Sequence, residues 1–218
     1  MDYKMLFEQY NNGDIGIEDL NLEKHETSYT NKIKNYLAEI KNYDKYTYTH
    51  CIRVGLLSLD ISNRIGCDKD IQTEVYFGGL IHDIGKIHIP KRILNKPDKL
   101  TNEEFEIIKL HSLLGTAHVF NSLPYWVIRI IRDHHEKLDG TGYPRKITKD
   151  HLNFQTRIVS VADIIDGYSS NRPYHTERNH TETMKFMEDA NGLDNMIINQ
   201  LIGNTDFHFK RLQHEFAQ

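Results

Sequence analysis

The chain has 218 residues, of which 39% are hydrophobic and 27% charged, a composition typical of a soluble globular protein that buries a core. Its net charge of −4 disfavours broad binding to nucleic acid polymers or anionic membranes, because both favour a basic surface. Two cysteines form no CxxC pair, the N-terminus lacks a signal-peptide pattern, and no apolar run approaches the length of a membrane span. We therefore expect a cytoplasmic protein with reduced thiols and no membrane partner.

The first part of the chain divides into an arm and the start of a helical domain. Residues 1–26 mix glycines and acids with few apolar residues, so we interpret them as an arm packed on a domain of residues 27–218. From about residue 27 apolar residues recur at helical spacing, and a second helix is predicted over 46–65, with Gly66 as its C-cap. His50 shares the apolar face of this second helix, so it points inward. A lone inward histidine is more often a core residue than a ligand.

The third predicted helix ends in a pair of residues that could bind a metal. It begins near Asp68 and ends at His82 and Asp83, where Gly85 breaks it. An adjacent imidazole and carboxylate at a helix end can be directed at one point, as a divalent metal requires. Residues 87–99 contain two prolines and are predicted to form a loop with at most one short turn.

The middle of the chain places three further histidines in similar surroundings. A capping box predicts a single helix over residues 101–120, with His111 on its inward face. Ser122 is the predicted N-cap of the next helix. That helix has an apolar stripe and ends in the doublet His134 and His135. The doublet is therefore expected to leave the end of a core helix, as the earlier His-Asp pair does.

The last third of the chain supplies a loop and a buried acid. Residues 136–150 form a long polar loop, typical of a binding loop or lid although a solvated connection has the same composition. A helix is predicted over 154–168, where Asp163 interrupts an apolar surface and therefore needs a hydrogen bond, an ion pair or a metal. Supporting helices are predicted near 178–190 and 193–216. No stretch resembles a strand, so the predicted fold class is all-α.

Five imidazoles and two carboxylates are thus predicted at helix ends or on inward faces. They are too many for one tetrahedral zinc, and no thiolates indicate a structural zinc site. Nitrogen and oxygen ligands favour iron or manganese, and one shared carboxylate would make a compact dinuclear centre. Two ions roughly 3.5–4 Å apart suit phosphodiester hydrolysis by a metal-activated hydroxide, with Lys86 offsetting charge on the phosphoryl oxygens. The predicted ligands are His50, His82, Asp83, His111, His134, His135 and Asp163.

Several short motifs then follow one another in a familiar order and spacing. They are His82-Asp83-Ile84-Gly85-Lys86, His134-His135-Glu136, Gly142-Tyr143-Pro144, Ala162-Asp163 and Arg172-Pro173-Tyr174. With these motifs the sequence resembles the HD-GYP family, the cyclic di-GMP-hydrolysing branch of the HD phosphohydrolases, over about residues 44–202. The resemblance implies an HD-domain helical bundle with extra C-terminal helices.

The resemblance also implies a role for each matching residue. Three ligands would hold each metal, namely His50, His82 and Asp163 for one ion and His111, His134 and His135 for the other. Asp83 would bridge the two ions together with water or hydroxide, and is the central catalytic residue with Lys86. Lys86 and Arg172 match positions that contact substrate phosphates, and Tyr143 matches a position that lines the substrate pocket. His175, also expected at the phosphate, stands where the family usually has Lys or Arg, which weakens one contact.

Two further expectations concern metals and partners. Some family members bind a third metal through a Glu that lies four residues before the first ligand histidine, and here that position is Tyr46. A neutral phenol is a poor ligand for a hard divalent ion, so we predict two ions per chain, and we expect them to be iron or manganese. His88 stands close enough in sequence to be an extra ligand candidate. The resemblance further implies that the loop Gly142-Tyr143-Pro144 meets partner proteins, such as a diguanylate cyclase or a separate sensor.

The leading functional hypothesis is a phosphodiesterase that opens cyclic di-GMP to linear pGpG, and in some relatives on to GMP. One alternative is a catalytically weak module that binds a cyclic dinucleotide or a partner protein without turnover. Another keeps the chemistry and changes the substrate, for example to cyclic GMP-AMP, because fold and metal ligands do not determine which base is recognised. Turnover assays across several cyclic dinucleotides separate these hypotheses.

Overall fold

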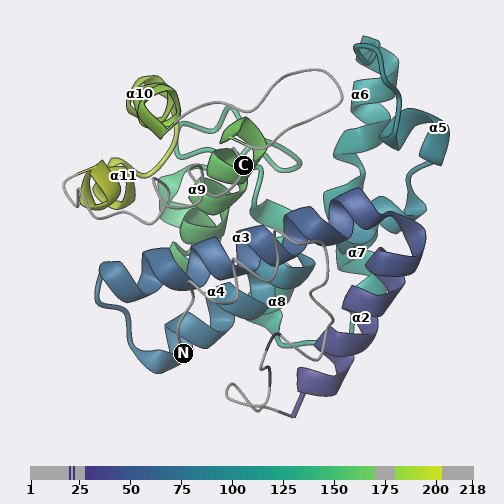
Figure 1. Cartoon of the computed structure of the whole chain (residues 1–218), viewed down its shortest axis with the longest axis horizontal. Helices are drawn as coiled ribbons and strands as arrows, with labels where there is room; N and C mark the ends of the chain where they lie inside the picture. The colour runs from purple at the N-terminus through teal and green to yellow at the C-terminus, as the bar shows by residue number, and fades with distance from the viewer. Residues whose placement is uncertain (1–19, 21, 23–27, 170–179, 203–218) are drawn as a thin grey trace, which may run out of the picture.

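The computed structural model describes residues 20, 22, 28–169 and 180–202. Within these ranges every regular element is a helix, and the one extended pairing is an isolated bridge between Asp139 and Thr148 (Figure 1). The prediction of an all-α fold is therefore confirmed. Arg172 and His175 lie outside the described residues, as do most of the predicted arm and the chain beyond residue 202.

Two long helices form the centre of the molecule. The helix α3 (Lys45–Arg64) packs along α4 (Lys69–Ile81), and α9 (Phe154–Ser169) lies against both (Figure 1). Glycines allow α3 and α4 to approach closely, because a Cβ atom at Gly79 would lie only 2.8 Å from the Cα atom of Gly55. The side chains of Asp44 and Asp68 cap the two helices at their N-termini, each accepting a backbone hydrogen bond.

Two clusters of buried apolar side chains stabilise this arrangement. The first joins α2 (Thr30–Tyr43) and α8 (Tyr125–Asp133) to one side of the α3–α4 pair, and it includes Leu20 and Leu22 from the predicted arm. The second lies between α3, α9 and the C-terminal helix α11 (Asn195–Ile202). Together they hold in fixed positions the ends of α4 and α8, the second turn of α3 and the middle of α9, where six of the seven predicted ligands lie.

The single helix predicted over residues 101–120 is wrong, because the chain forms two. The capping box at Thr101 is present and opens α6 (Asn102–Lys109), but α7 (His111–Val119) begins a new direction after Leu110. Leu110 keeps helical backbone angles, so no glycine or proline signals the break. The cause is tertiary: α7 packs directly on the segment around Gly85, whereas α6 has no buried residue and turns outward beside the short α5 (Lys91–Leu94).

Two predicted helix boundaries also differ from the structure. Ser122 is not the N-cap of α8, which begins after Pro124; the Ser122 hydroxyl instead donates to the carbonyl of Val119. Gly85 does not simply break α4, because the chain continues from Ile81 into a short 3-10 helix, η3 (Ile84–His88). Gly85 is needed there for a close approach, since a Cβ atom would lie 1.8 Å from the His111 carbonyl oxygen.

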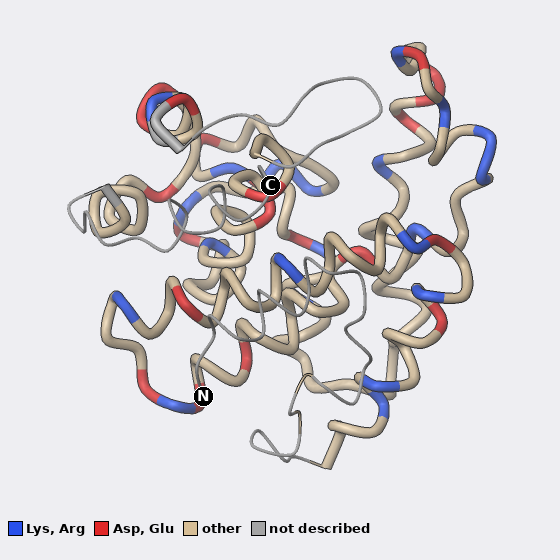
Figure 2. The backbone as a smooth tube through the Cα atoms, viewed as in Figure 1, with Lys and Arg blue, Asp and Glu red and all other residues tan. Residues whose placement is uncertain are grey.

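The remaining helices follow the predicted order. The helix α10 (His180–Asp189) and α11 correspond to the helices predicted near 178–190 and 193–216, as far as the chain is described. Lysines and arginines are interspersed with acidic residues over the outer helices, as Figure 2 shows. Among the described residues, no helix combines the length and the apolar character that crossing a membrane requires.

Candidate metal centre

All seven predicted ligands come together, although they belong to five separate segments of the chain. The second turn of α3 and the middle of α9 each supply one residue, the ends of α4 and α8 supply two each, and α7 supplies its first residue. Their donor atoms form three overlapping groups, each with all atoms within 4.8 Å of one another. The groups are Asp83-His111-His134-His135, His50-His82-Asp83 and His82-His134-Asp163.

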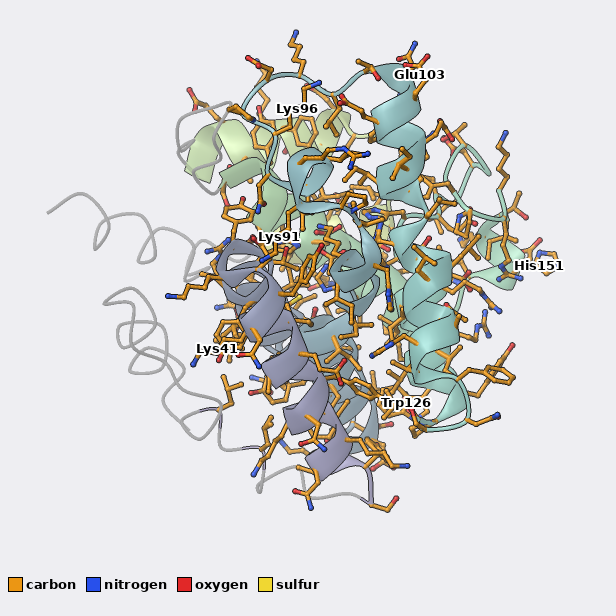
Figure 3. All side chains as sticks on the ribbon, turned by 90° about the vertical axis from the view of Figure 1, so that its right-hand side faces the viewer. Lys41, Lys91, Lys96, Glu103, Trp126 and His151 are labelled. Carbon is orange, nitrogen blue, oxygen red and sulfur yellow. The ribbon has the colours of Figure 1, made fainter. Side chains whose placement is uncertain are left out.

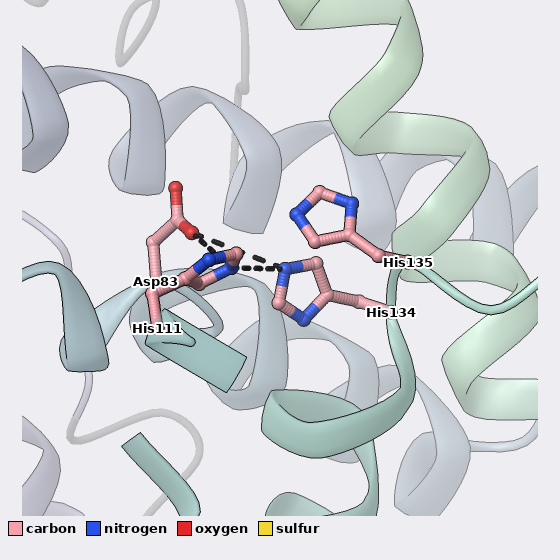
Figure 4. Close-up of side chains that lie close together, drawn as sticks. All are labelled: Asp83, His111, His134 and His135. Atoms are coloured by element: carbon pink, nitrogen blue, oxygen red, sulfur yellow. Dashed lines mark hydrogen bonds and ion pairs between the residues drawn. The ribbon is translucent and has the colours of Figure 1, made fainter. Parts of the chain in front are cut away.

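Asp83 lies at the middle of the cluster and separates the histidines into two sets. Its Oδ2 atom is 3.4 Å from His50 Nε2 and 3.3 Å from His82 Nε2. Its Oδ1 atom is 3.2 Å from His111 Nε2 and 3.9 Å from His134 Nε2 (Figure 4). Each carboxylate oxygen therefore faces a different pair of imidazoles, which is the arrangement that a bridging carboxylate requires.

The second carboxylate, Asp163, also reaches both sides of the cluster. Its Oδ1 atom lies 3.1 Å from His50 Nε2 and 3.8 Å from His82 Nε2. Its Oδ2 atom lies 3.8 Å from His135 Nδ1. The family resemblance implied that Asp163 serves the first metal alone, whereas its position also allows contact with the set that contains His135.

Backbone carbonyls fix the orientation of three of the rings. The Nδ1 atoms of His82, His111 and His134 lie 2.8, 2.7 and 3.0 Å from the carbonyl oxygens of Gly79, Ile108 and Ile131. A carbonyl oxygen only accepts hydrogen bonds, so each of these Nδ1 atoms carries a proton. In the neutral ring the Nε2 lone pair is then directed at the centre, as metal ligation requires.

A third acid, which the motifs did not reveal, orients His50. The Oδ2 atom of Asp166 lies 2.7 Å from His50 Nδ1, and its carboxylate also accepts hydrogen bonds from Arg53. Burial would raise the pKa of Asp166, but Arg53 and His50 hold it well below its ordinary value. The signal in the sequence was the spacing of Asp163 and Asp166, three residues apart on one helix.

The electrostatics of the cluster favour bound cations. Burial lowers the pKa of His111 to about 4 and that of His135 to about 3, so both rings stay neutral near pH 7. Burial would also lower the pKa of His50, but the neighbouring carboxylates outweigh it and raise the value to about 10. The two ionised carboxylates thus attract positive charge, which a proton supplies at His50 when no metal does.

Two buried atoms give an independent test of whether metal ions fit. In the part of the chain that is described, His82 Nε2 and Asp83 Oδ1 are buried without any hydrogen-bond partner. Leaving such an atom unsatisfied costs about 1–3 kcal/mol, and more for a charged group. The donor set consists only of imidazole nitrogens and carboxylate oxygens, which suits first-row divalent ions, so the residues present fit a metal centre.

A cavity of about 380 Å³ opens over the cluster and contains other predicted site residues. Lys86 lines it with its Nζ atom 2.5 Å from Asp83 Oδ2, and Tyr143 lines it with its ring stacked on His135 at 4.7 Å. The loop that bears Tyr143 is held by Glu136, a buried residue whose carboxylate accepts backbone hydrogen bonds from Arg145 and Ile147.

Two residues considered at the sequence level lie apart from this cavity. His88 is exposed and faces His118, with 3.3 Å between their ring nitrogens, so it is not an additional ligand. Tyr46 lies one turn before His50 and is 41% exposed. Neither residue lines the cavity over the cluster.

Comparison with known proteins shows the family to which the chain belongs. The HD domain family matches residues 25–197 of the chain. A Thermotoga maritima protein named cyclic di-GMP phosphodiesterase is 39% identical over 164 residues, which are 74% of this chain and 44% of that protein. The structure of Bd1817, an HDG"Y"P protein from Bdellovibrio bacteriovorus, aligns with a TM-score of 0.60 and 19% identity over 97% of this chain and 62% of that one. The chain belongs to the HD-GYP family of HD domains.

Other relatives carry a different substrate in their names. A Vibrio cholerae protein named 3′3′-cGAMP-specific phosphodiesterase 1 is 30% identical over 172 residues, which are 76% of this chain and 39% of that protein. The chain thus spans less than half the length of these two curated relatives. The HD-GYP relationship therefore covers most of this chain but only part of each relative.

Proposed function

We propose that the chain is a metal-dependent phosphodiesterase that hydrolyses a cyclic dinucleotide, with cyclic di-GMP as substrate and linear pGpG as product. The observation that carries this proposal is Asp83, whose two oxygens face separate pairs of imidazoles, some of which line the neighbouring cavity. The names of the curated relatives support the substrate class, because they include cyclic di-GMP and 3′3′-cGAMP phosphodiesterases.

In this proposal the seven ligands hold two divalent ions, iron or manganese. His50, His82 and Asp163 would hold one ion, and His111, His134 and His135 the other, with Asp83 between them. When bound, the ions would polarise the phosphodiester and lower the pKa of the attacking water from about 15.7 towards 7. The protein contributes neutral imidazoles of fixed orientation and a carboxylate, Asp166, that supports His50.

Lys86 is proposed to bind the substrate phosphate. Burial would lower the pKa of its ammonium group, but Asp83 outweighs burial and raises it, so Lys86 is charged near pH 7. It lines the cavity beside the cluster, where a positive charge would stabilise the charge that develops on the phosphoryl oxygens. Arg172 and His175 remain proposed phosphate contacts on the strength of the motif alone.

Aromatic side chains that line the cavity are suited to flat, apolar groups. They are Phe105, Tyr168 and Phe186, and the rings of Tyr168 and Phe186 stack with centroids 4.0 Å apart and an interplanar angle of 10°. Nucleobases stack on aromatic side chains irrespective of base identity. We propose that these aromatic side chains receive a base while Lys86 and the metal ions hold the phosphate, which supports a nucleotide substrate.

The loop Gly142-Tyr143-Pro144 is also proposed to contact a partner protein, such as a diguanylate cyclase or a sensor. Gly142 is buried against Glu136, because a Cβ atom there would lie 2.4 Å from the Glu136 Cα atom. Tyr143 packs on His135, so a partner that moved this loop would also move a ring of the metal cluster. This contact is a means of control in the proposal, and the hydrolytic site does not depend on it.

One experiment tests the proposal. The protein is purified anaerobically, its iron and manganese are measured, and turnover of cyclic di-GMP, 3′3′-cGAMP and cyclic di-AMP is followed together with the products. We expect two ions per chain and the highest kcat/KM for cyclic di-GMP, with pGpG as first product. Faster turnover of 3′3′-cGAMP would change the assigned substrate and keep the reaction. Metal-loaded protein that binds these ligands and hydrolyses none of them would contradict the proposal and favour a binding module.

A further inference from the structure

A second cavity, of about 480 Å³, shares no lining residue with the cavity over the metal centre. Four arginines from three segments line it, and we call it the arginine pocket. Its arginines are Arg129 and Arg132 from α8, Arg145 from the loop after Pro144, and Arg157 from α9. His151, which also lines the pocket, lies at the edge of the molecule in Figure 3. A cavity of this size is large enough for a small-molecule ligand.

A buried carboxylate fixes two of the four guanidinium groups. Asp133 is fully buried, and its oxygens accept hydrogen bonds from Arg132 Nε and Nη2 at 2.9 and 3.0 Å. They also accept hydrogen bonds from Arg145 Nε and Nη2 at 3.1 and 2.9 Å. Arg145 therefore uses one edge of its guanidinium fork, and its Nη1 has no hydrogen bond to the described part of the chain. A guanidinium held in this way loses little freedom when it binds an anion.

Arg129 supplies a donor that lacks an acceptor. Its Nη2 donates to the carbonyl of His151, but its Nε is buried and, among the described residues, has no hydrogen-bond partner. A buried N–H group without an acceptor is unfavourable, and it leaves the Arg129 guanidinium beside the pocket with unused donor capacity. This is one of four such side-chain atoms in the described residues, and two of the others belong to the metal centre.

The charge of the pocket favours an anion of limited size. The four guanidinium groups are accompanied by three carboxylates, because Asp133 and Asp194 bind arginines and Asp150 lines the pocket. One positive charge therefore remains in excess. The chain as a whole carries −4, and nucleic acid polymers require many positive charges along a path, so a small phosphate-bearing ligand fits better than a polymer.

An aromatic side chain at the pocket indicates which phosphate-bearing ligand fits. Tyr125 lines the pocket and is 67% exposed, so its ring offers a surface on which a nucleobase can stack. From the arginines and this ring, we propose that the arginine pocket binds a nucleoside 5′-monophosphate. The phosphate contacts Arg129, Arg132 and Arg145, and the base lies against Tyr125. The terminal phosphate of a nucleoside monophosphate accepts more charge-assisted hydrogen bonds than a phosphodiester does. The proposal does not depend on the reaction at the metal centre.

Calorimetric titration of the metal-loaded full chain with GMP tests this proposal, because the metal centre and the pocket can be separated by variants. We expect two GMP sites per chain. Arg129→Gln and, separately, Arg145→Gln weaken one site by about tenfold or more, as the loss of a charge-assisted hydrogen bond implies, and leave the other unchanged. Lys86→Ala shows the reverse pattern. Arg92→Gln, which removes an exposed arginine of α5, changes neither site and serves as the matched control.

Two further titrations identify the part of the ligand that is recognised. Inorganic phosphate binds the pocket more weakly than GMP does and is affected by the same two variants, whereas guanosine does not bind there. The proposal is overturned by a single GMP site that only Lys86→Ala weakens, or by wild-type GMP affinity at both sites in Arg129→Gln and Arg145→Gln. Equal binding of guanosine and GMP at the second site would likewise exclude recognition through the phosphate.

Discussion

The metal centre and the arginine pocket meet at the C-terminal end of α8, yet they favour ligands of opposite charge. Asp133 is enclosed by two arginines, whereas the next residue, His134, faces Asp83 at 3.9 Å. Successive side chains at a helix end point to different sides, so one short segment contributes to both sites. Both sites contain acidic and basic residues. The charge of the ligand that each site prefers therefore depends on which of its groups stay ionised after burial.

The two sites differ in the groups that remain charged. In the metal centre burial keeps His111 and His135 neutral, with pKa values of about 4 and 3, whereas neighbouring positive groups keep the pKa values of Asp83 and Asp163 low, so both carboxylates stay ionised. In the arginine pocket the guanidinium groups stay protonated at any ordinary pH, so they outnumber the carboxylates beside them. Cations are therefore favoured in one site and anions in the other, and variants that remove one charge test this difference.

The largest effect is expected for Asp83→Ala. One carboxylate faces both sets of imidazoles, so its removal is expected to abolish most metal binding and essentially all hydrolysis. Elemental analysis and turnover assays measure both quantities. Asp98→Ala, at an exposed loop position, is the matched control and should keep wild-type values. If Asp83 served only the local helix end, its loss would cost about 0.5–2 kcal/mol of stability and leave turnover intact. A folded variant with normal turnover would therefore disprove the metal assignment.

A smaller loss is expected for Asp166→Asn, which keeps the shape of the residue and removes its charge. Asp166 is not one of the seven predicted ligands but contacts one of them, His50. Outer-shell partners of this kind contribute roughly 10–100-fold to metal affinity. Competition with a chelator measures the affinity. Asp60→Asn, at a carboxylate that pairs with Arg64 away from the centre, is the control. Equal affinity in the Asp166 variant and the wild type would show that the charge of Asp166 is not needed to orient His50.

The ligands could be predicted from the sequence because two independent patterns coincide at them. His50 and His111 continue apolar helical faces, and Asp163 interrupts one, so each had to point inward and find a partner. The motif order then connected helices that are far apart in the chain. The sequence did not show that the two oxygens of Asp83 face different sets of rings, or that Asp163 lies near both sets. Both features depend on how the helix ends are oriented in three dimensions.

Other features could not be predicted because they arise from packing alone. The break after Leu110 has no glycine or proline and follows from the contact of α7 with Gly85. The four arginines of the pocket come from three segments that are separate in the sequence, so their spacing along the chain does not show that they line one cavity. Asp133 precedes the histidine doublet and carries no motif of its own, although it is fully buried. Such sites become visible only when the segments are placed together.

A shift of a few degrees in thermal unfolding is expected to distinguish the two sites in one experiment. Metal at about 100 times its Kd stabilises the folded state by about 2.7 kcal/mol, which is roughly 5–10 °C for a chain of this size. GMP at tenfold its Kd adds about 1.4 kcal/mol, or roughly 3–5 °C. After chelation the GMP shift should persist in the wild type and disappear in Arg145→Gln. Loss of the GMP shift on chelation would mean that GMP binds only at the metal centre.

The smallest expected change concerns the number of metal ions, and it tests how complete the cluster is. Tyr46 lies one helical turn before His50, where a Glu helps to bind a third metal in some HD-GYP proteins as the sequence resemblance implies. Its neutral phenol, with an ordinary pKa near 10, is a poor ligand for a hard divalent ion. We therefore expect two ions per chain in the wild type and a count that rises towards three in Tyr46→Glu when metal is in excess.

Elemental analysis of anaerobically prepared protein measures this count, with Tyr46→Gln as the uncharged control of similar length to the Glu variant. The control should keep two ions, because an amide oxygen without a negative charge binds such an ion weakly. Three ions in the unmodified protein would refute the dinuclear arrangement. Since His88 faces His118 rather than the cluster, the additional ligand would then have to be a carboxylate, and Asp166 beside His50 is the nearest candidate in the described part of the chain.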